Sequence, residues 1–192
     1  MQVFQSIIFL FFCIVLFNQG HFEISAQDNW EEIKSHHFVV YYPENKKTFA
    51  KQVLRVAEQD YFRVADYLRY SRRSNFWTWN NRVKIYLYPD KFTYLKETAA
   101  LQASNGMADY DQKTIYSFLE SPDFLESILP HEIAHLIFRD FVGFHKNVPL
   151  WLDEGIAQWA EVKNRKERHE IAKSYAKAGM LLPLKRMMII NI

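Results

Sequence analysis

Residues 129–136 read Leu-Pro-His-Glu-Ile-Ala-His-Leu and contain the pattern His-Glu-x-x-His. In a helix, residues four apart lie one turn apart on one face, so His131 and His135 can present two imidazole nitrogens to a single ion. Zinc accepts neutral imidazole at about 2.0–2.1 Å, and a catalytic zinc site has three protein ligands and an open water position. Glu132 is placed beside that water as a general base. The stretch therefore predicts a metal-bearing helix that needs a third ligand.

The segment at residues 148–161, VPLWLDEGIAQWAE, offers this third ligand. Its apolar residues predict a helix with few polar positions, and Glu154 lies among them. A carboxylate is costly to bury unless it is paired or bound to a metal. Eighteen residues separate His135 from Glu154, which is enough for the first helix to end, a loop to turn and a second helix to pack antiparallel. Glu154 is therefore the favoured third ligand.

Taken together, these residues resemble a known family. The spacing of His131-Glu132-x-x-His135, then eighteen residues, then Glu154 is similar to that of the gluzincin metallopeptidases, in particular the peptidase MA-like group. The resemblance covers residues 124–161 and, more loosely, the segment before them. The combined spacing is specific, whereas the five-residue motif alone is not.

Other assignments of the third ligand fit less well. Metzincins continue the motif with a glycine and a third histidine, but Phe138 and Phe141 occupy those positions. His145 is an alternative ligand, although it follows Gly143 in a predicted loop, and Asp153 is another. An acid near the start of a helix is also favoured by the helix dipole without any metal. That explanation accounts for a carboxylate there, but not for its apolar surroundings or its spacing from His135.

The resemblance implies one Zn²⁺ held by His131, His135 and Glu154, and hydrolysis of a peptide bond. Zinc would lower the pKa of its bound water towards 7, and Glu132 would take the water proton and pass it to the leaving amine. The expected partner is a peptide or protein substrate. The alternative is a non-catalytic secreted binding module that keeps the same fold as a scaffold.

The resemblance also implies supporting groups. Second-shell partners should hold the two imidazoles by their other N–H, with Gln158 and backbone carbonyls as candidates and Asp153 ranked below them. Thermolysin-like members carry Asp at the Gln158 offset, so the chain departs from the family there. An extended substrate would add to a sheet edge, for which residues 106–110 are the candidate. The oxyanion-stabilising Tyr or His usually follows the third-ligand helix, where only His169 and Tyr175 occur.

The first 26 residues predict a secretory signal peptide. They contain an unbroken apolar run at residues 7–17 and a small residue, Ala26, before a cut at Gln27. A spanning helix needs roughly 20 apolar residues, so the run is too short to cross a bilayer. Its departure from the pattern is the absence of Lys and Arg. We expect a secreted or periplasmic protein, with an uncleaved membrane anchor as the alternative.

The composition, the net charge and the cysteine count exclude further classes of function. The chain has 192 residues, 49% of them hydrophobic, and a net charge of +2. This is ample for one core, and the weak charge gives no case for binding nucleic acid or a membrane surface. The single cysteine, Cys13, lies within the predicted signal, so residues 27–192 can form neither a disulfide nor a cysteine-ligated zinc site.

The pattern of the remaining chain predicts an α+β fold. Strands are expected at residues 38–42 and 83–88 and in a hairpin spanning 107–119, and a long amphipathic helix at 49–68. A short helix follows the second strand at 92–100. Pro130 requires that the metal helix either begins near it or is kinked there.

We therefore expect residues 27–192 to form one domain, with a small N-terminal mixed sheet of three or four strands and one long helix. A helical half carrying the metal site should follow. The charged run at residues 163–170 predicts a solvated helix, continued by an apolar stripe up to Pro183. The apolar tail at residues 188–192 leaves two alternatives: a short member of the family, or a domain that lacks a C-terminal portion. The oligomeric state and cleavage preference are not encoded in any recognisable pattern.

Overall fold

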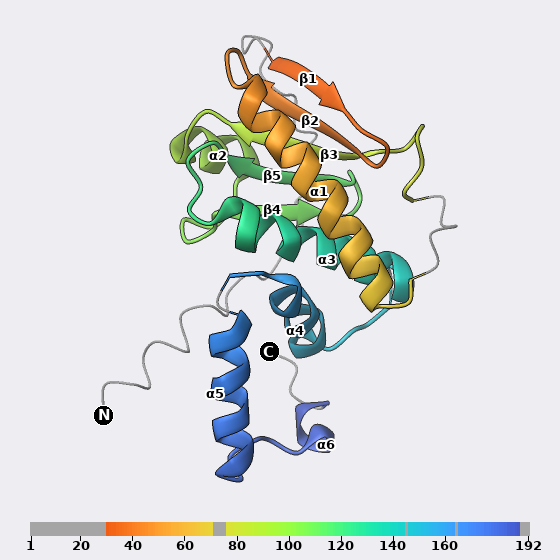
Figure 1. The fold of residues 1–192 in the computed structure, drawn as a ribbon, viewed down its shortest axis with the longest axis vertical. Coiled ribbons are helices and arrows are strands. Elements are labelled where there is room, and N and C mark those ends of the chain that lie inside the picture. Colours follow the sequence, from red (N-terminus) through yellow and green to blue (C-terminus); the bar gives the residue numbers. More distant parts are fainter. Residues whose placement is uncertain (1–29, 71–75, 145, 164, 189–192) are drawn as a thin grey trace.

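Short runs of β-branched and aromatic residues form the strands of a five-stranded mixed sheet, and helices cover both of its faces (Figure 1). The computed structural model describes residues 30–70, 76–144, 146–163 and 165–188. From Phe124 onwards the described chain forms only helices, and the last two of them lie far from the first strand along the longest axis. The predicted α+β class is confirmed.

The sheet is built from two antiparallel hairpins joined by parallel pairs. Its strands are β1 (Trp30–Lys34), β2 (Phe38–Pro43), β3 (Val83–Tyr88), β4 (Gly106–Asp109) and β5 (Thr114–Phe118), in the spatial order β1-β2-β3-β5-β4. β2, β3 and β5 run parallel, while β1 pairs with β2 and β4 with β5 in antiparallel fashion. β1 and β4 are therefore the two edges of the sheet. The prediction of three or four strands missed β1.

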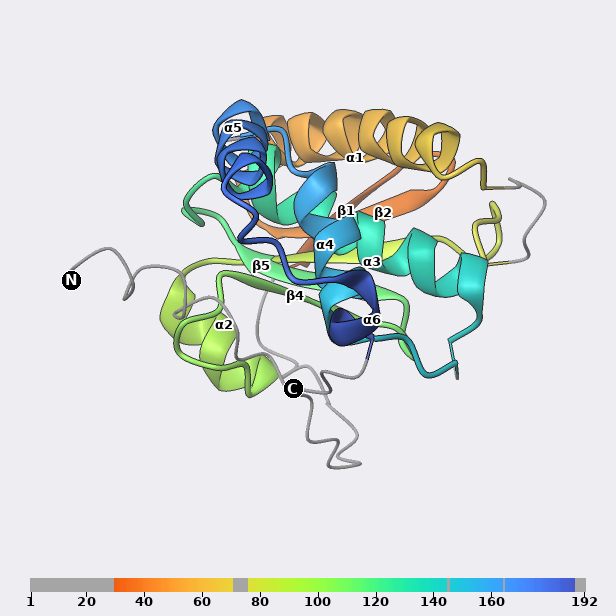
Figure 2. The same cartoon turned by 90° about the horizontal axis from the view of Figure 1, so that it is seen from below.

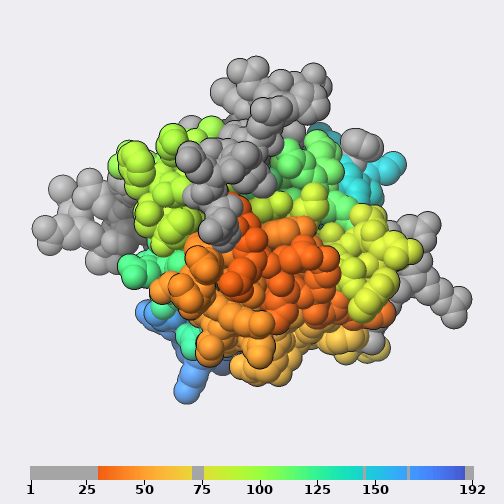
Figure 3. Space-filling view, turned by 90° about the horizontal axis from the view of Figure 1, so that it is seen from above, coloured from red at the N-terminus to blue at the C-terminus, as the bar shows by residue number. Residues whose placement is uncertain are grey.

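Two helices lie on opposite faces of the sheet, as Figure 2 shows. The long helix α1 (Lys47–Tyr67) covers one face, and the short helix α2 (Lys91–Thr98) covers the other. Apolar residues of α1 recur every three or four positions and are buried against the alternate residues of β2 and β3. The surface at the β1 edge is formed by β1, β2 and the start of α1, coloured red to orange in Figure 3.

The face of the sheet turned towards α2 carries a row of tyrosines. Tyr41, Tyr86 and Tyr116 are aligned across β2, β3 and β5 by the strand register. The ring centroids of Tyr41 and Tyr86 lie 4.6 Å apart, and those of Tyr86 and Tyr116 lie 5.7 Å apart. Stacked aromatic pairs across strands stabilise a sheet beyond the area that they bury.

The metal helix predicted from the sequence is α3 (Leu129–Val142), preceded by a single π-helical turn, η2 (Phe124–Ile128). Pro130 lies in the first turn of α3, where its missing N–H costs no hydrogen bond. α3 thus begins next to Pro130, directly after a separate π-helical turn, as the first of the two alternatives for Pro130 predicted. α3 packs against α1, β4 and the next helix, and most of its first ten residues are buried.

Three further helices complete the described chain: α4 (Leu150–Ala160), α5 (Arg165–Lys177) and α6 (Leu184–Met187). α4 packs against α3, whereas α5 and α6 bury none of their residues. Among the described residues, no helix is both long and apolar enough to cross a bilayer. The predicted signal peptide at residues 1–26 and the alternative ligand His145 lie outside the described residues.

Candidate metal centre

The two histidines of the motif face each other on α3. Their Nε2 atoms lie 3.1 Å apart, and their rings are nearly perpendicular, with an interplanar angle of 76°. The one-turn spacing predicted from the sequence therefore brings both imidazoles to one point. His135 is buried, while His131 remains partly accessible.

Glu154 on α4 meets the two imidazoles at the same point. Its carboxylate oxygens lie 3.5 Å from His131 Nε2 and 3.6 Å from His135 Nε2. Four ligands held at about 2.0–2.1 Å around a tetrahedral ion are about 3.3–3.4 Å from one another. The Nε2–Nε2 separation and the two contacts of Glu154, made by Oε2 to His131 and by Oε1 to His135, lie near that value, so the arrangement is compatible with a tetrahedral zinc ion.

Each imidazole is held from behind by a carboxylate. His131 Nδ1 lies 2.9 Å from Glu161 Oε1, and His135 Nδ1 lies 3.0 Å from Asp153 Oδ1. An ionised carboxylate only accepts hydrogen bonds, so both Nδ1 atoms carry the proton. In the neutral tautomer each Nε2 then presents a lone pair to the space shared with Glu154. Two lone pairs and a carboxylate around one point require a proton or a cation between them.

Two arginines fix the supporting carboxylates. Arg139 Nε and Nη2 donate to Asp153 Oδ2 at 2.9 and 2.5 Å, and Arg168 Nη1 donates to Glu161 Oε2 at 2.8 Å. Asp153 is almost fully buried, with 3% of its surface exposed, so its charge depends on these partners. This network of two histidines, three carboxylates and two arginines lies between residues 131 and 168.

The protonation of the site follows from these contacts. Burial acts to lower the pKa of His131, but hydrogen bonds to Glu154 and Glu161 outweigh it and raise that pKa to about 10. Burial acts to raise the pKa of Glu154, yet the two imidazoles hold it below its usual value. Without a metal the pocket therefore retains a proton at neutral pH, and a divalent cation would displace it.

Glu132 lies on the side of α3 that faces the sheet edge. Burial raises the pKa of its carboxyl, while the charges of His131 and His135 act in the opposite direction. The backbone N–H of Ala108 in β4 also acts to lower the pKa of this carboxyl. Glu132 is thus in contact with the edge strand and beside both imidazoles, as a general base for a metal-bound water requires.

Tyr110, the last residue of the predicted substrate edge, is a neighbour of the site for which the sequence indicated no role of its own. It follows β4, and the guanidinium carbon of Arg139 lies 5.8 Å from its ring centroid. Burial raises the pKa of its phenol, and the charges of Asp153 and Glu132 raise it further. The hydroxyl therefore stays protonated and can donate a hydrogen bond near the candidate base.

The structure brings together the four residues predicted from the sequence, His131, Glu132, His135 and Glu154. The expected support from Gln158 is wrong, because its side chain lines a separate pocket and the imidazoles are held by carboxylates instead. Asp153, ranked low, holds His135. Glu161 was missed, although its position two turns after Glu154 on the same helix face could have indicated it.

Family models and curated proteins were compared with the chain. No family model matches the chain, and no curated protein matches it significantly. What the site can do is therefore inferred from its geometry and its chemistry.

Proposed function

We propose that residues 27–192 form a zinc-dependent metallopeptidase of the gluzincin type. The observation that carries this proposal is the convergence of two Nε2 atoms and one carboxylate while both Nδ1 atoms are held by Asp153 and Glu161. An imidazole whose distal N–H binds a carboxylate is the usual arrangement of a histidine that ligates zinc. A chance His-Glu-x-x-His on a helix would not supply two such partners.

The donor set favours zinc. Two imidazoles and one carboxylate suit a borderline ion, and with three protein ligands a tetrahedral site keeps one position open for water. Magnesium and calcium prefer six or more oxygen ligands, which this site does not offer among the described residues. His131, His135 and Glu154 would hold the ion.

The proposed reaction is the hydrolysis of a peptide bond. When bound, zinc would supply Lewis acidity and a water of lowered pKa. Glu132 accepts the proton of the attacking water and delivers it to the leaving amine. Tyr110 is a candidate donor to the developing oxyanion, a role for which the sequence offered only His169 and Tyr175.

The edge strand β4 supports a peptide as the substrate. β4 is an edge of the sheet and packs against α3, the helix that carries Glu132. An extended peptide added along β4 would have its backbone beside the candidate base. This placement agrees with the substrate edge that the family resemblance implies for residues 106–110.

The metal is tested by zinc analysis of purified protein. We expect about one zinc per chain, loss of most of it in Glu154→Ala and its retention in His145→Ala. The opposite pattern would overturn the ligand assignment.

Catalysis is tested by the hydrolysis of a broad peptide library by wild type and Glu132→Gln at equal zinc content. Glu132 is not a ligand, so the variant should keep its metal and lose about 10²–10⁴-fold in rate. Equal cleavage by both proteins would exclude Glu132 as the base. Zinc binding with no cleavage by the wild type would favour the binding module.

A further inference from the structure

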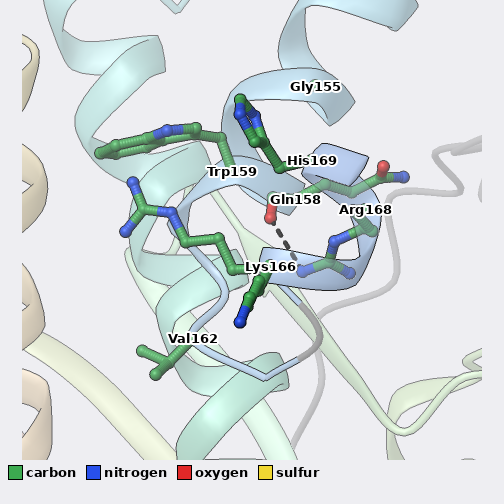
Figure 4. A pocket seen from close by; sticks show the side chains of 8 residues that line it. Gly155, Gln158, Trp159, Val162, Lys166, Arg168 and His169 are labelled. Carbon is green, nitrogen blue, oxygen red and sulfur yellow. Dashed lines mark hydrogen bonds between the residues drawn. The ribbon is translucent and has the colours of Figure 1, made fainter. Parts of the chain in front are cut away.

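A pocket lies between α4 and α5, next to the candidate metal centre (Figure 4). Its volume is about 750 Å³, within the usual range for ligand pockets. Gly155, Gln158 and Trp159 of α4 form one wall, and four residues of α5 contribute the other. Gly155 directly follows Glu154, so the pocket begins at the residue after the proposed third ligand.

The α5 wall of the pocket is basic. Arg165, Lys166, Arg168 and His169 line it, and no aspartate or glutamate is among its lining residues. Figure 4 shows Lys166, Arg168 and His169 around the opening. Glu167 lies on the other side of α5, because residues two apart are separated by about 200° around a helix axis. The side chains that line the pocket thus include several basic groups and no acidic group, although the net charge of the whole protein is small.

The two arginines of the α5 wall are held in place. Arg165 lies with its guanidinium carbon 4.3 Å from the ring centroid of Trp159, and Tyr67 stacks on that ring at 3.4 Å. Arg168 Nη2 donates to the carbonyl oxygens of Gln158 and Lys163 at 3.2 and 3.0 Å. A guanidinium group preorganised as that of Arg165 is loses little conformational entropy when it binds a carboxylate.

The pocket is also linked to the metal centre. Arg168 contacts Glu161, which holds His131, so one arginine belongs both to the pocket wall and to the support of a proposed ligand. One bound peptide could therefore place a side chain in the pocket and a nearby peptide bond at the metal.

We propose that this pocket binds the carboxylate side chains of an acidic peptide, which makes acidic peptides the preferred substrates of the proposed peptidase. The claim that acidic peptides are substrates rests on the proposed function. The claim that the pocket binds carboxylates rests only on the contacts within the pocket. Carboxylates match the planar donors of arginine in bidentate fashion, and Trp159 offers apolar contact to the intervening methylene groups.

The test uses zinc-loaded Glu132→Gln, which binds substrate without cutting it. Two randomised peptide pools are compared by calorimetry, one rich in glutamate and one with glutamine at the same positions. We expect the acidic pool to bind about tenfold more tightly. The double variant Arg165→Gln/Lys166→Gln should abolish most of this difference, whereas Lys173→Gln, on the same helix but paired with Glu170, should keep it.

Cleavage by the wild type separates the two proposals. An acidic preference in binding without any cleavage would overturn the peptidase and leave the pocket assignment standing. Cleavage of both pools at equal rates, with equal binding, would overturn the pocket assignment alone. Inorganic phosphate that binds as tightly as the acidic pool would identify a general anion site and contradict the proposed preference for peptide carboxylates.

Discussion

Replacement of Asp153 by asparagine separates the two tasks of this residue. Its carboxylate accepts from His135 on one oxygen and from Arg139 on the other. Asparagine keeps the size of the side chain but removes the charge, and its amide cannot accept with both terminal atoms. Either His135 or Arg139 therefore loses its partner.

The magnitudes follow from the burial of the pair. Breaking a fully buried ion pair lowers the free energy of unfolding by about 3–5 kcal/mol. The Arg139–Asp153 pair should contribute less, because 18% of the Arg139 side chain is exposed and Arg139 also donates to the Lys146 carbonyl. We therefore expect the free energy of unfolding to fall by about 2–3 kcal/mol. Loss of a second-shell partner typically weakens metal binding by about 10–100-fold, which corresponds to about 1.4–2.7 kcal/mol.

The assay combines zinc affinity, from competition with a chelator, with urea unfolding of the metal-free protein. Arg139→Gln is the matched control, because it breaks the ion pair and leaves the His135–Asp153 contact in place. It should lose stability to a similar extent but lose less than tenfold in zinc affinity. A folded Asp153→Asn protein that binds zinc within about twofold of the wild type would refute the supporting role of Asp153.

Three further changes test the scaffold around the site. Glu58 accepts from Ser35 Oγ and from the His37 backbone and ring; burial acts to raise its pKa, but these bonds hold it below its ordinary value. The ionised Glu58 carboxylate therefore stabilises the fold fully above its ordinary pKa, and this stabilisation is lost as the pH falls through the folded-state pKa. In urea unfolding, Glu58→Gln should lower the free energy of unfolding by about 1–2 kcal/mol at pH 7 and should not change it in strong acid. Gly106→Ala should destabilise by about 1–3 kcal/mol in thermal unfolding yet keep its zinc, because the added Cβ would lie 2.4 Å from Ile128 Cγ2; unchanged stability would contradict this contact. Tyr110→Phe should lower kcat about 10–10³-fold at constant zinc content and similar KM, and an unchanged kcat would exclude Tyr110 as an oxyanion donor.

The elements with strong periodicity were predictable. The alternation in residues 83–88 and the three-and-four spacing of the long helix placed β3 and α1 to within two residues. β1 was missed because Trp30-Glu-Glu-Ile-Lys is polar on both sides, as an edge strand can be, and gives no alternation. Its pairing depends on β2, which no local pattern encodes.

The site was predictable in its ligands but not in its support. His131 and His135 are fixed by helical spacing, and Glu154 by its apolar surroundings. The choice between Asp153 and Gln158 depended on the rotation of α4 about its axis, which packing against α3 sets. Tyr110 and Arg168 come from segments with no motif, so only the tertiary structure brings them near the histidines.

The position of the polar network between residues 131 and 168 has a consequence for folding. Contacts between neighbouring helices close short loops and cost little chain entropy, whereas the parallel pairing of β2, β3 and β5 joins segments far apart in the sequence. The α3–α4 pair can therefore assemble at low entropic cost, before the sheet is complete. In refolding experiments, zinc present from the start should then bind the α3–α4 pair before the sheet has formed, and not only the fully folded protein.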